Sequence, residues 1–282
     1  MASKALIFDI QRSSLVDGDG VRTAVFFKGC NLRCKWCHNP EGLLPRVQML
    51  VYGDRCRGCG ECKSVCPSPS ECTLCGKCAL FCPSGARELC GKEYTARELL
   101  SEILKDKAYY GATGGGVTLT GGECLLQPEP LIEILSLCKE NGINTAIDTA
   151  GNVPSELLER VFPYTDTFLY DIKCISEELH VEGTGVSNRQ IIENLRMLKR
   201  LGADIIVRVP VIGGFNDTDA EMVKILDLVA EIKPRRCELL PYHPLGRSKC
   251  EALCVKFNEF ETPTSEKISH FKSLATARGI TL

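Results

Sequence analysis

Short apolar segments alternate with amphipathic ones along most of this chain. Six mainly apolar segments predict buried strands, at residues 23–27, 117–120, 145–148, 168–171, 205–209 and 237–240. Apolar residues at spacings of three and four predict helices around 99–104, 131–138, 191–198, 222–229 and 268–274. Such an alternation of strands and helices is typical of a parallel sheet.

Single residues mark the ends of several of these elements. Thr95 and Glu98 form a capping box at the start of the first helix. Gly142 and Gly202 follow the second and third helices, at the position where glycine commonly ends a helix. Pro210 is expected to end the strand at 205–209.

About six strand–helix units are too few for the full eight-stranded barrel. The sequence therefore predicts a partial, open (β/α)6 TIM-like barrel, with a doubly wound sheet as the alternative. In both folds the chemistry lies beyond the C-terminal ends of the strands. The polar residues expected there are 120–123, 148–149, 171–173, Arg208 and 242–243.

The composition changes between about Leu44 and Cys90. This stretch is rich in Cys, Pro, Gly and Ser and has few long apolar side chains. It predicts a small inserted domain at residues 45–90, held together by something other than a hydrophobic core. Residues 1–44 and 91–282 would form the barrel.

The overall composition limits the kinds of partner. The chain has 282 residues, 44% of them hydrophobic, and a net charge of −2 without a basic patch, so neither nucleic acid nor an anionic membrane is expected as a partner. We find no signal peptide and no run of about 18–20 apolar residues that predicts a membrane span. A soluble, cytoplasmic monomer is expected.

Cysteine is the unusual residue. Most of the 18 cysteines lie in two dense runs between Cys30 and Cys82. A secreted mini-protein of this cysteine density would suggest disulfides, but this chain is long, has a core and lacks an export signal. Metal ligation in a reducing compartment is therefore favoured over disulfides.

The first run is Cys30-x3-Cys34-x2-Cys37, directly after a predicted strand. Three thiolates close in sequence can hold three corners of a 4Fe–4S cluster and leave the fourth iron open to a substrate or cofactor. A structural zinc site with His38 as the fourth ligand is the alternative. It is disfavoured because neighbouring residues seldom reach one metal together.

The second run repeats the bacterial ferredoxin pattern C-x2-C-x2-C-x3-C-P twice. In that pattern the fourth cysteine of each repeat ligates the other cluster. The predicted ligands are Cys56, Cys59, Cys62 and Cys82 for one 4Fe–4S cluster, and Cys72, Cys75, Cys78 and Cys66 for the other. Three 4Fe–4S clusters are thus expected in the chain. Zinc ribbons use pairs of CxxC and do not need triplets that end in Cys-Pro.

The first cysteine run resembles the signature of the radical S-adenosylmethionine (SAM) superfamily. More specifically, the chain resembles the activating enzymes of glycyl-radical enzymes, of which pyruvate formate-lyase activase is the best-known member. The motifs that carry this resemblance are VDGDGVR (16–22), FKGC (27–30), CHNP (37–40), GGGVTLTGGE (114–123), IDTAG (147–151), LYDIK (169–173), GVSN (185–188) and LLPYHPLGRSK (239–249). The family usually has Asp-Gly-Pro-Gly where this chain has Asp17-Gly18-Asp19-Gly20.

The resemblance implies an activity. SAM would chelate the open iron, an electron from the reduced cluster would cleave its S–C bond, and the resulting 5′-deoxyadenosyl radical would remove a hydrogen atom from a glycine of a partner glycyl-radical enzyme. A flavodoxin or ferredoxin is the implied electron donor. A radical SAM enzyme acting on a small molecule and a multi-cluster electron-transfer protein are the alternatives.

The resemblance also implies cofactor contacts. Gly121 and Gly122 would allow close approach of the methionyl group, and Glu123 would accept from its amino group. Trp36 and His38 match positions that contact adenine. The alternatives are a plain strand-to-helix turn for the glycines and an ordinary surface histidine for His38.

The remaining implied residues lie at other predicted strand ends. Asp148 and Thr149 match a site for a monovalent cation, with Asp148 as a helix N-cap the alternative. Ser187 and Asn188 would lie near the ribose. The implied catalytic residues, which surround the methionyl group and the partner's glycine, are Asp171, Lys173, Arg208 and His243. Ordinary surface ion pairing is their alternative.

Overall fold

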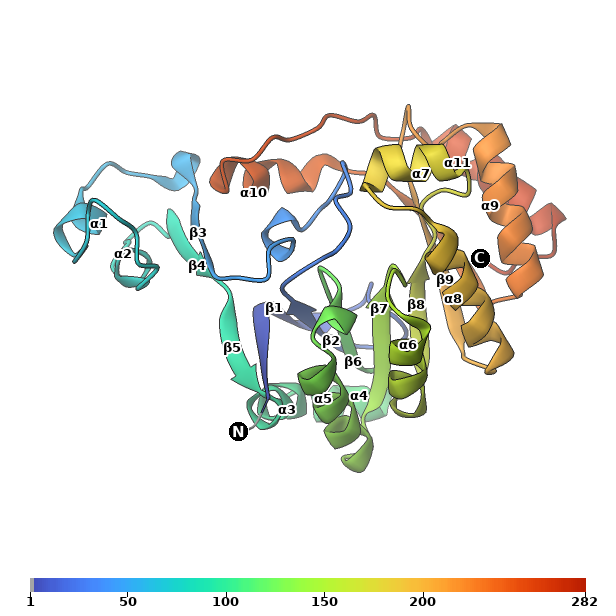
Figure 1. Ribbon diagram of the computed structural model, residues 1–282, viewed down its shortest axis with the longest axis horizontal. Coiled ribbons are helices and arrows are strands. Elements are labelled where there is room, and N and C mark those ends of the chain that lie inside the picture. The colour runs from blue at the N-terminus through green and yellow to red at the C-terminus, as the bar shows by residue number, and fades with distance from the viewer. Residues whose placement is uncertain (1–2) are drawn as a thin grey trace.

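The computed structural model describes residues 3–282 and contains one eight-stranded sheet in the order β10-β9-β8-β7-β6-β2-β1-β5 (Figure 1). Six of its strands are parallel neighbours: β2 (Arg22–Phe27), β6 (Gly116–Gly121), β7 (Asn144–Thr149), β8 (Thr167–Asp171), β9 (Ile205–Val211) and β10 (Arg236–Pro241). They follow one another in space as they do in sequence. This sequential order is that of a partial (β/α)6 barrel, and it excludes the doubly wound alternative, whose strand order reverses.

Two further strands extend the sheet beyond β2. β1 (Lys4–Ser14) and β5 (Lys92–Thr95) are antiparallel to their neighbours. The pairing of β1 with β2 shifts register twice, between Ile7 and Asp9 and between Gln11 and Ser14. The chain therefore enters the fold as an irregular hairpin, and residues 15–21 link its two strands.

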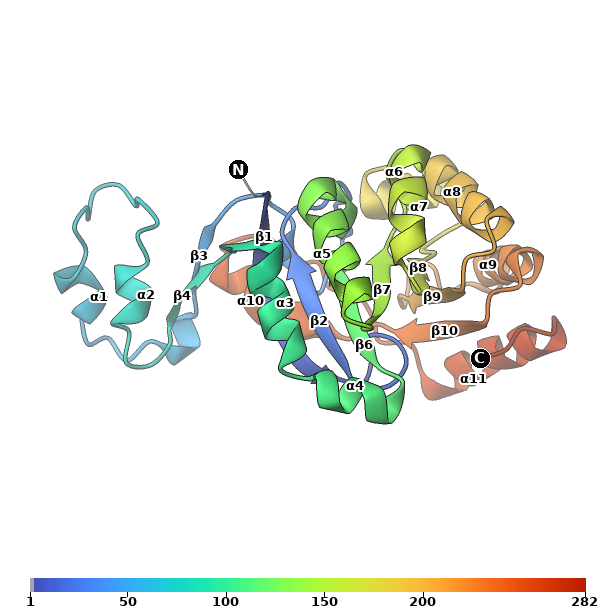
Figure 2. The ribbon, with the colours of Figure 1, turned by 90° about the horizontal axis from the view of Figure 1, so that it is seen from below.

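One face of the sheet is apolar and covered by helices. Alternate residues of the parallel strands, such as Val25, Leu119, Ile147 and Val207, belong to the main hydrophobic core. The covering helices are α3 (Ala96–Leu104), α5 (Pro128–Glu140), α6 (Ser155–Val161), α8 (Arg189–Arg200), α9 (Asp219–Ile232) and α11 (Ser265–Ala277). α3, α5, α6, α8 and α9 pack side by side in sequence order, and α11 packs on α9 (Figure 2). Each large side chain buried here contributes about 1.5–3 kcal/mol.

The other face of the sheet is polar. Thr120, Asp148, Asp171, Arg208 and Glu238 come from five parallel strands, and the strand registers place them on this face. Parallel strands buried on both faces are normally apolar throughout, so this row of polar residues is unusual for a parallel sheet.

The predicted helix signals are confirmed. Thr95 and Glu98 form a complete capping box at the start of α3. Gly142 and Gly202 have positive φ values of 67° and 78° just after α5 and α8. In this left-handed region glycine avoids the steric cost that a side chain would meet.

The prediction that Pro210 ends a strand is wrong, because β9 continues to Val211. The ladder between β8 and β9 reaches only the pair Asp171 and Arg208. Pro210 lies two residues beyond that pair, so its missing N–H removes no hydrogen bond to β8. Its carbonyl accepts from the side-chain amide of Asn216 at 2.7 Å instead.

Shorter elements complete the chain. The remaining helices are α4 (Lys107–Thr113), α7 (Glu177–Thr184) and α10 (Arg247–Ala252), and the 3-10 turns are η1 (Pro40–Gly42), η2 (Gly53–Arg55), η3 (Cys124–Leu126), η4 (Phe162–Tyr164) and η5 (Pro244–Gly246). Within residues 3–282, every helix is too short or too polar to cross a membrane.

The cysteine-rich segment projects from one end of the sheet (Figure 1). It rises from an antiparallel hairpin of β3 (Gln48–Val51) and β4 (Arg87–Cys90), and it contains two single-turn helices, α1 (Glu61–Ser64) and α2 (Lys77–Leu80). Every residue from 53 to 85 is exposed or half-buried. Only the base has an apolar cluster, of Leu50, Tyr52, Cys90 and Ala252. The boundaries 45 and 90 and the ferredoxin-like character stay predictions.

A segment without buried residues is expected to depend on bound iron. Removing iron with a chelator should make residues 53–85 sensitive to protease, while the barrel stays intact, because only the barrel has a hydrophobic core. Limited proteolysis with mass spectrometry, before and after chelation, locates the cuts. Equal resistance of the segment in both samples would contradict this expectation.

Candidate functional site

The first three cysteines lie in a loop that directly follows β2. Backbone hydrogen bonds hold this loop on both sides: Cys30 N–H donates to Leu43 O at 3.1 Å, and Arg33 N–H donates to Thr184 O, at the end of α7, at 2.7 Å. Within the loop, Leu32 N–H donates to the Cys30 sulfur at 3.4 Å. The thiols therefore sit at the carboxyl end of the sheet, as the sequence predicted for the chemistry.

These three thiols are half-buried. Burial raises the pKa of Cys30 and of Cys37 to about 12, and it raises the pKa of Cys34 as well. Bound iron would reverse this effect, because a coordinating thiol is deprotonated. Within residues 3–282, no three Cys, His, Asp or Glu side chains are arranged to hold a single metal ion. In a cubane cluster each thiolate binds a different iron, so three thiols on one loop fit that cluster without meeting at one point.

An aromatic cluster adjoins the cysteine loop. Trp36 is buried, with its ring centroid 4.9 Å from that of Phe215. His38 stacks on His243 with centroids 4.0 Å apart, although the two residues are 205 positions apart in sequence. Burial lowers the pKa of His38 to about 4, and its buried Nε2 has no hydrogen-bond partner among the described residues. His38 is therefore not the fully bonded surface histidine of the alternative.

Gly121 and Gly122 bring two backbones into contact. A Cβ on Gly122 would lie 2.3 Å from the carbonyl oxygen of Gly29, and one on Gly121, whose φ is +123°, would lie 2.2 Å from the amide nitrogen of Phe27. Glu123 N–H then donates to Gly29 O at 2.8 Å. Glycine is thus required to seat the cysteine loop on the loop after β6. A role of these glycines beside a methionyl group stays a prediction.

Glu123 is a buried carboxylate that ties two loops together. It accepts from the Thr149 hydroxyl at 2.8 Å, from Ala150 N–H at 3.1 Å and from Leu125 N–H at 3.3 Å. Burial raises the pKa of Glu123 to about 7, although these donors oppose the rise. The loops after β6 and β7 are therefore joined through one side chain.

Charged side chains converge at the ends of the next strands. Asp148 accepts from Thr120 at 2.9 Å and lies 3.3 Å from Arg208 Nη1. Lys173 Nζ donates to Asp171 at 2.7 Å. The Lys173 and Arg208 side chains are only 9% and 13% exposed, so these are not ordinary surface ion pairs.

The charges around this group shift its pKa values. Burial raises the pKa of Asp148 against the opposing charge of Arg208. Burial would lower the pKa of Lys173, but the charges of Asp171 and Cys34 outweigh it and the pKa is raised. The N-cap of α6 is Pro154, so the alternative role of Asp148 as a helix N-cap is wrong.

Ser187 and Asn188 serve a local bond network. The Ser187 hydroxyl donates to Glu177 at 2.8 Å, and the Asn188 amide donates to the carbonyls of Cys174 and Ile175. These bonds join the loop after β8 to the start of α8. Their predicted place near a ribose stays a prediction.

Two charged residues near the site, Lys28 and Glu238, were given no role by the sequence analysis. Lys28 is fully buried directly before the cysteine loop, and its ammonium donates to Glu41 O at 2.5 Å and to Gln48 Oε1 at 3.1 Å. Glu238 lies beside Arg208 in the sheet. The available signals were a lysine at the end of an apolar strand and a glutamate inside one.

The eight cysteines of the projecting segment are accessible. Cys56, Cys59, Cys72 and Cys75 are exposed, and Cys62, Cys66, Cys78 and Cys82 are half-buried. The pKa of Arg87 is raised: burial alone would lower it, but hydrogen bonds and charge from Cys62 and Cys78 prevail. The ligand assignments of these cysteines stay predictions.

The bond between Thr149 and Glu123 is expected to stabilise the fold more at high pH. Near pH 6 the carboxyl is mostly protonated and near pH 8 mostly ionised, so Thr149→Val should lower the Tm more at pH 8. The loss should correspond to about 1–3 kcal/mol there, as for a hydrogen bond to a charge. Thermal denaturation at both pH values tests this, with the exposed Thr276→Val as control. An equal loss at both values would contradict it.

Comparison with known proteins gives the family. Residues 24–229 match the family model described as the Radical SAM superfamily. The chain is 41% identical to the trans-4-hydroxy-L-proline dehydratase activating enzyme of Clostridioides difficile, over 96% of each chain. It is 43% identical to the choline trimethylamine-lyase activating enzyme of Oleidesulfovibrio alaskensis, over 89% of this chain and 87% of the other.

A solved structure agrees with this result. A domain of the pyruvate-formate lyase-activating enzyme from Bacteroides vulgatus aligns with a TM-score of 0.52 and 29% identity, over 60% of this chain and 97% of that one. The resemblance seen in the sequence motifs is confirmed. The chain belongs to the radical SAM superfamily and, within it, to the activating enzymes of glycyl-radical enzymes.

Proposed function

We propose that this chain binds SAM between the cysteine loop 30–37 and the polar strand ends, and that it generates a glycyl radical on a partner glycyl-radical enzyme. The observation that carries this proposal is that three half-buried thiols and four charged groups lie at one end of the sheet. Those groups are Asp148, Asp171, Lys173 and Arg208. When bound, a 4Fe–4S cluster would supply the electron that cleaves the sulfonium of SAM.

The chain's own residues bind and orient the cofactor. The buried Lys173 and the half-buried Arg208 offer two positive charges, which suit the carboxylate of a methionyl group. His38 and His243 are stacked, and the buried Nε2 of His38 has no hydrogen-bond partner within the described residues, which suits a heteroaromatic ring such as adenine. Asp148 is a hard oxygen donor that suits a monovalent cation, although Thr149 already donates to Glu123.

The partner follows from the family. The two relatives described above are named as activating enzymes of a dehydratase and of a lyase. Both names describe an enzyme that activates another enzyme. The activated enzyme is a dehydratase in one case and a lyase in the other. We therefore assign this chain the activation step, with a glycyl-radical enzyme as its protein substrate. The cytoplasmic location and the monomeric state stay predictions.

We further propose that the projecting segment carries two 4Fe–4S clusters and delivers electrons from a flavodoxin or ferredoxin. The base of the segment is bound to the residues on either side of the cysteine loop, which supports this role. Lys28 bridges Glu41 and the hairpin residue Gln48, and Lys249 of α10 lies 2.5 Å from Glu41. A fixed path length is what electron transfer between clusters requires.

The cysteine loop is tested by Cys34→Ala. With two thiols left, the cluster should not assemble, so iron should fall from about twelve to about eight atoms per chain and the formation of 5′-deoxyadenosine should be lost. Cys138→Ala, in the main core, is the control and should keep both. Parent-level cleavage by Cys34→Ala would sink the assignment, and a parent content near four irons would refute clusters in the segment.

Electron delivery is tested by replacing Cys59 and Cys75 with Ala. The variant should lose SAM cleavage with a flavodoxin or ferredoxin as donor but keep it with a small chemical reductant. An equal loss with both donors, while the first cluster stays intact by electron paramagnetic resonance, would exclude delivery. Normal cleavage with both donors but no radical on the partner would indicate a docking surface instead.

A further inference from the structure

A row of charged side chains crosses the polar face of the sheet, from the loop 15–21 to the strand ends. Arg236 and Glu238 are two positions apart on β10, so their side chains point to the same face of the sheet. Glu238 is the direct neighbour of Arg208 on β9. Asp19, in the loop, pairs with both Arg235 and Arg236, and its Oδ1 lies 2.6 Å from Arg236 Nη1.

This row is continuous. Arg236 Nη2 lies 2.7 Å from Glu238 Oε1, and Glu238 Oε2 lies 3.6 Å from Arg208 Nε. Arg208 in turn reaches Asp148. Side-chain exposure falls from 41% at Asp19 to 26% at Glu238 and 13% at Arg208. The row therefore runs from solvent into the proposed SAM site.

The loop also contacts Arg208 directly. Arg208 Nη2 donates to the carbonyl of Val16 at 3.4 Å. Every contact of the guanidinium described above is 3.3 Å or longer, and its Nε has no hydrogen-bond partner within residues 3–282. No tight bidentate pair fixes Arg208. The position of the Arg208 side chain therefore depends on the charges around it and on the position of the loop 15–21.

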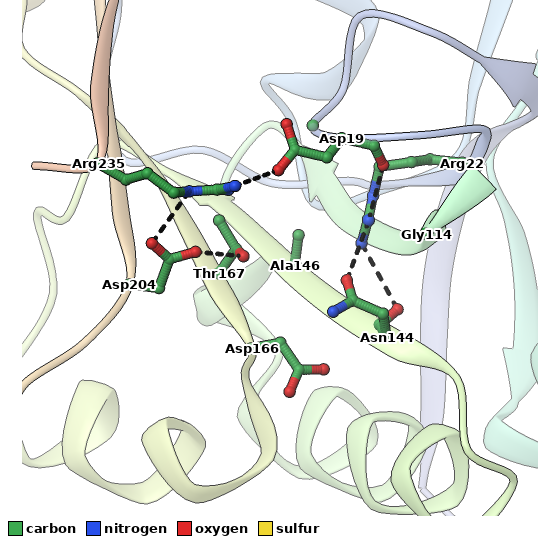
Figure 3. Close-up of a pocket in the computed structure, with 10 residues that line it drawn as sticks. Asp19, Arg22, Gly114, Asn144, Ala146, Asp166, Thr167, Asp204 and Arg235 are labelled. Atoms are coloured by element: carbon green, nitrogen blue, oxygen red, sulfur yellow. Dashed lines mark hydrogen bonds and ion pairs between the residues drawn. The ribbon is translucent and has the colours of Figure 1, made fainter. Parts of the chain in front are cut away.

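Part of the loop 15–21 lines a cavity. A cavity of about 210 Å³ opens at the amino ends of β6 to β9, and Asp19 and Arg235 lie at its edge with Asp204 and Arg22 (Figure 3). Gly18 and Gly20, which flank Asp19, have φ values of 115° and 68°. Gly20 packs on the backbone of residues 113–115, where a Cβ would lie 2.5 Å from Gly115 N, whereas Asp19 lines the cavity and is held by its pairs with Arg235 and Arg236.

We propose that Asp19 and Glu238 are positioning residues. The row of ion pairs, from Asp19 through Arg236 and Glu238 to Arg208, couples the position of the loop 15–21 to the position of the Arg208 guanidinium. Leu15 and Val16 at the start of the loop are 73% and 74% exposed, so this part of the loop is accessible to a partner protein. Because such coupling is reciprocal, an anionic ligand on Arg208 tightens the loop, and a displaced loop weakens the hold of Arg208 on that ligand. The ligand assignment rests on the proposed function, whereas the coupling itself does not.

The coupling is tested first without any activity. Amide hydrogen exchange of residues 14–21 is measured in the anaerobic, iron-reconstituted protein. Glu238→Gln should speed this exchange about twofold to tenfold, although the Glu238 side chain pairs only with arginines outside the loop. Glu231→Gln, which removes an exposed pair with Arg196 between α8 and α9, should leave it unchanged. Unchanged exchange in Glu238→Gln overturns the proposal.

A double-mutant cycle tests the connection to the site. Equilibrium dialysis gives the Kd for SAM in Asp19→Asn, in Glu238→Gln and in the double variant. Each single change should weaken binding about twofold to tenfold, and the double variant should bind no more weakly than Glu238→Gln. Additive losses overturn the proposal, because they would show two independent effects.

Two controls keep the outcomes separate. If Glu238→Gln loses its iron, Arg236→Gln breaks the same row one position nearer the loop and replaces it in both experiments. If the parent protein fails to bind SAM, the proposed function falls, while the exchange result still decides whether the loop and Glu238 are coupled.

Discussion

The structure depends on a parallel sheet that keeps charged side chains on one face. Helices cover the opposite face and bury Val25, Leu119, Ile147 and Val207 in the main core. A carboxylate or guanidinium removed from water is costly unless a partner of opposite charge is near. Arg208 meets that condition by pairing with Asp148 of β7, and Lys173 by pairing with Asp171, two residues before it. The contacts that Arg208 makes in these pairs are long. The ion pairs therefore offset the cost of placing charges on this face, and they also leave the Arg208 guanidinium able to bind a ligand.

The cysteine loop and the projecting segment are joined to this sheet by different means. The loop is held by backbone contact: Gly122 lies so close to the carbonyls of Gly29 and Gly42 that a side chain there would not fit. The segment has no core between 53 and 85 and is held only at its base, by a small apolar cluster and by Lys28. Burying a lysine is favourable only when acceptors surround its ammonium. This lysine therefore contacts both the base of the segment, through Gln48, and the turn after the cysteine loop, through Glu41.

Local signals made much of the fold predictable. The six parallel strands and their order follow from apolar runs separated by amphipathic helices, and the cysteine spacing pointed to the loop after β2 as the place of the proposed site. β1 and β5 were missed because their sequences alternate weakly and their pairing is set by the tertiary structure. Pro210 was misjudged because the length of the neighbouring strand decides whether a missing N–H matters. Glu238 was missed for the same kind of reason: its role depends on Arg208 and Arg236 standing beside it, and spacing along one strand does not show neighbours on another.

Aspartate at position 19 restrains the loop 15–21 in a different way from the proline that is usual in the family. The related activating enzymes usually have proline at this position, and proline fixes φ whatever the rest of the chain does. Asp19 restrains the loop through Arg235 and Arg236, more than 200 residues away. Exposed pairs of this kind contribute only about 0–1 kcal/mol each and weaken with salt. The substitution therefore exchanges a permanent local restraint for a reversible long-range one. Because ion pairs weaken with salt and a proline ring does not, the restraint on this part of the loop depends on ionic strength in this chain.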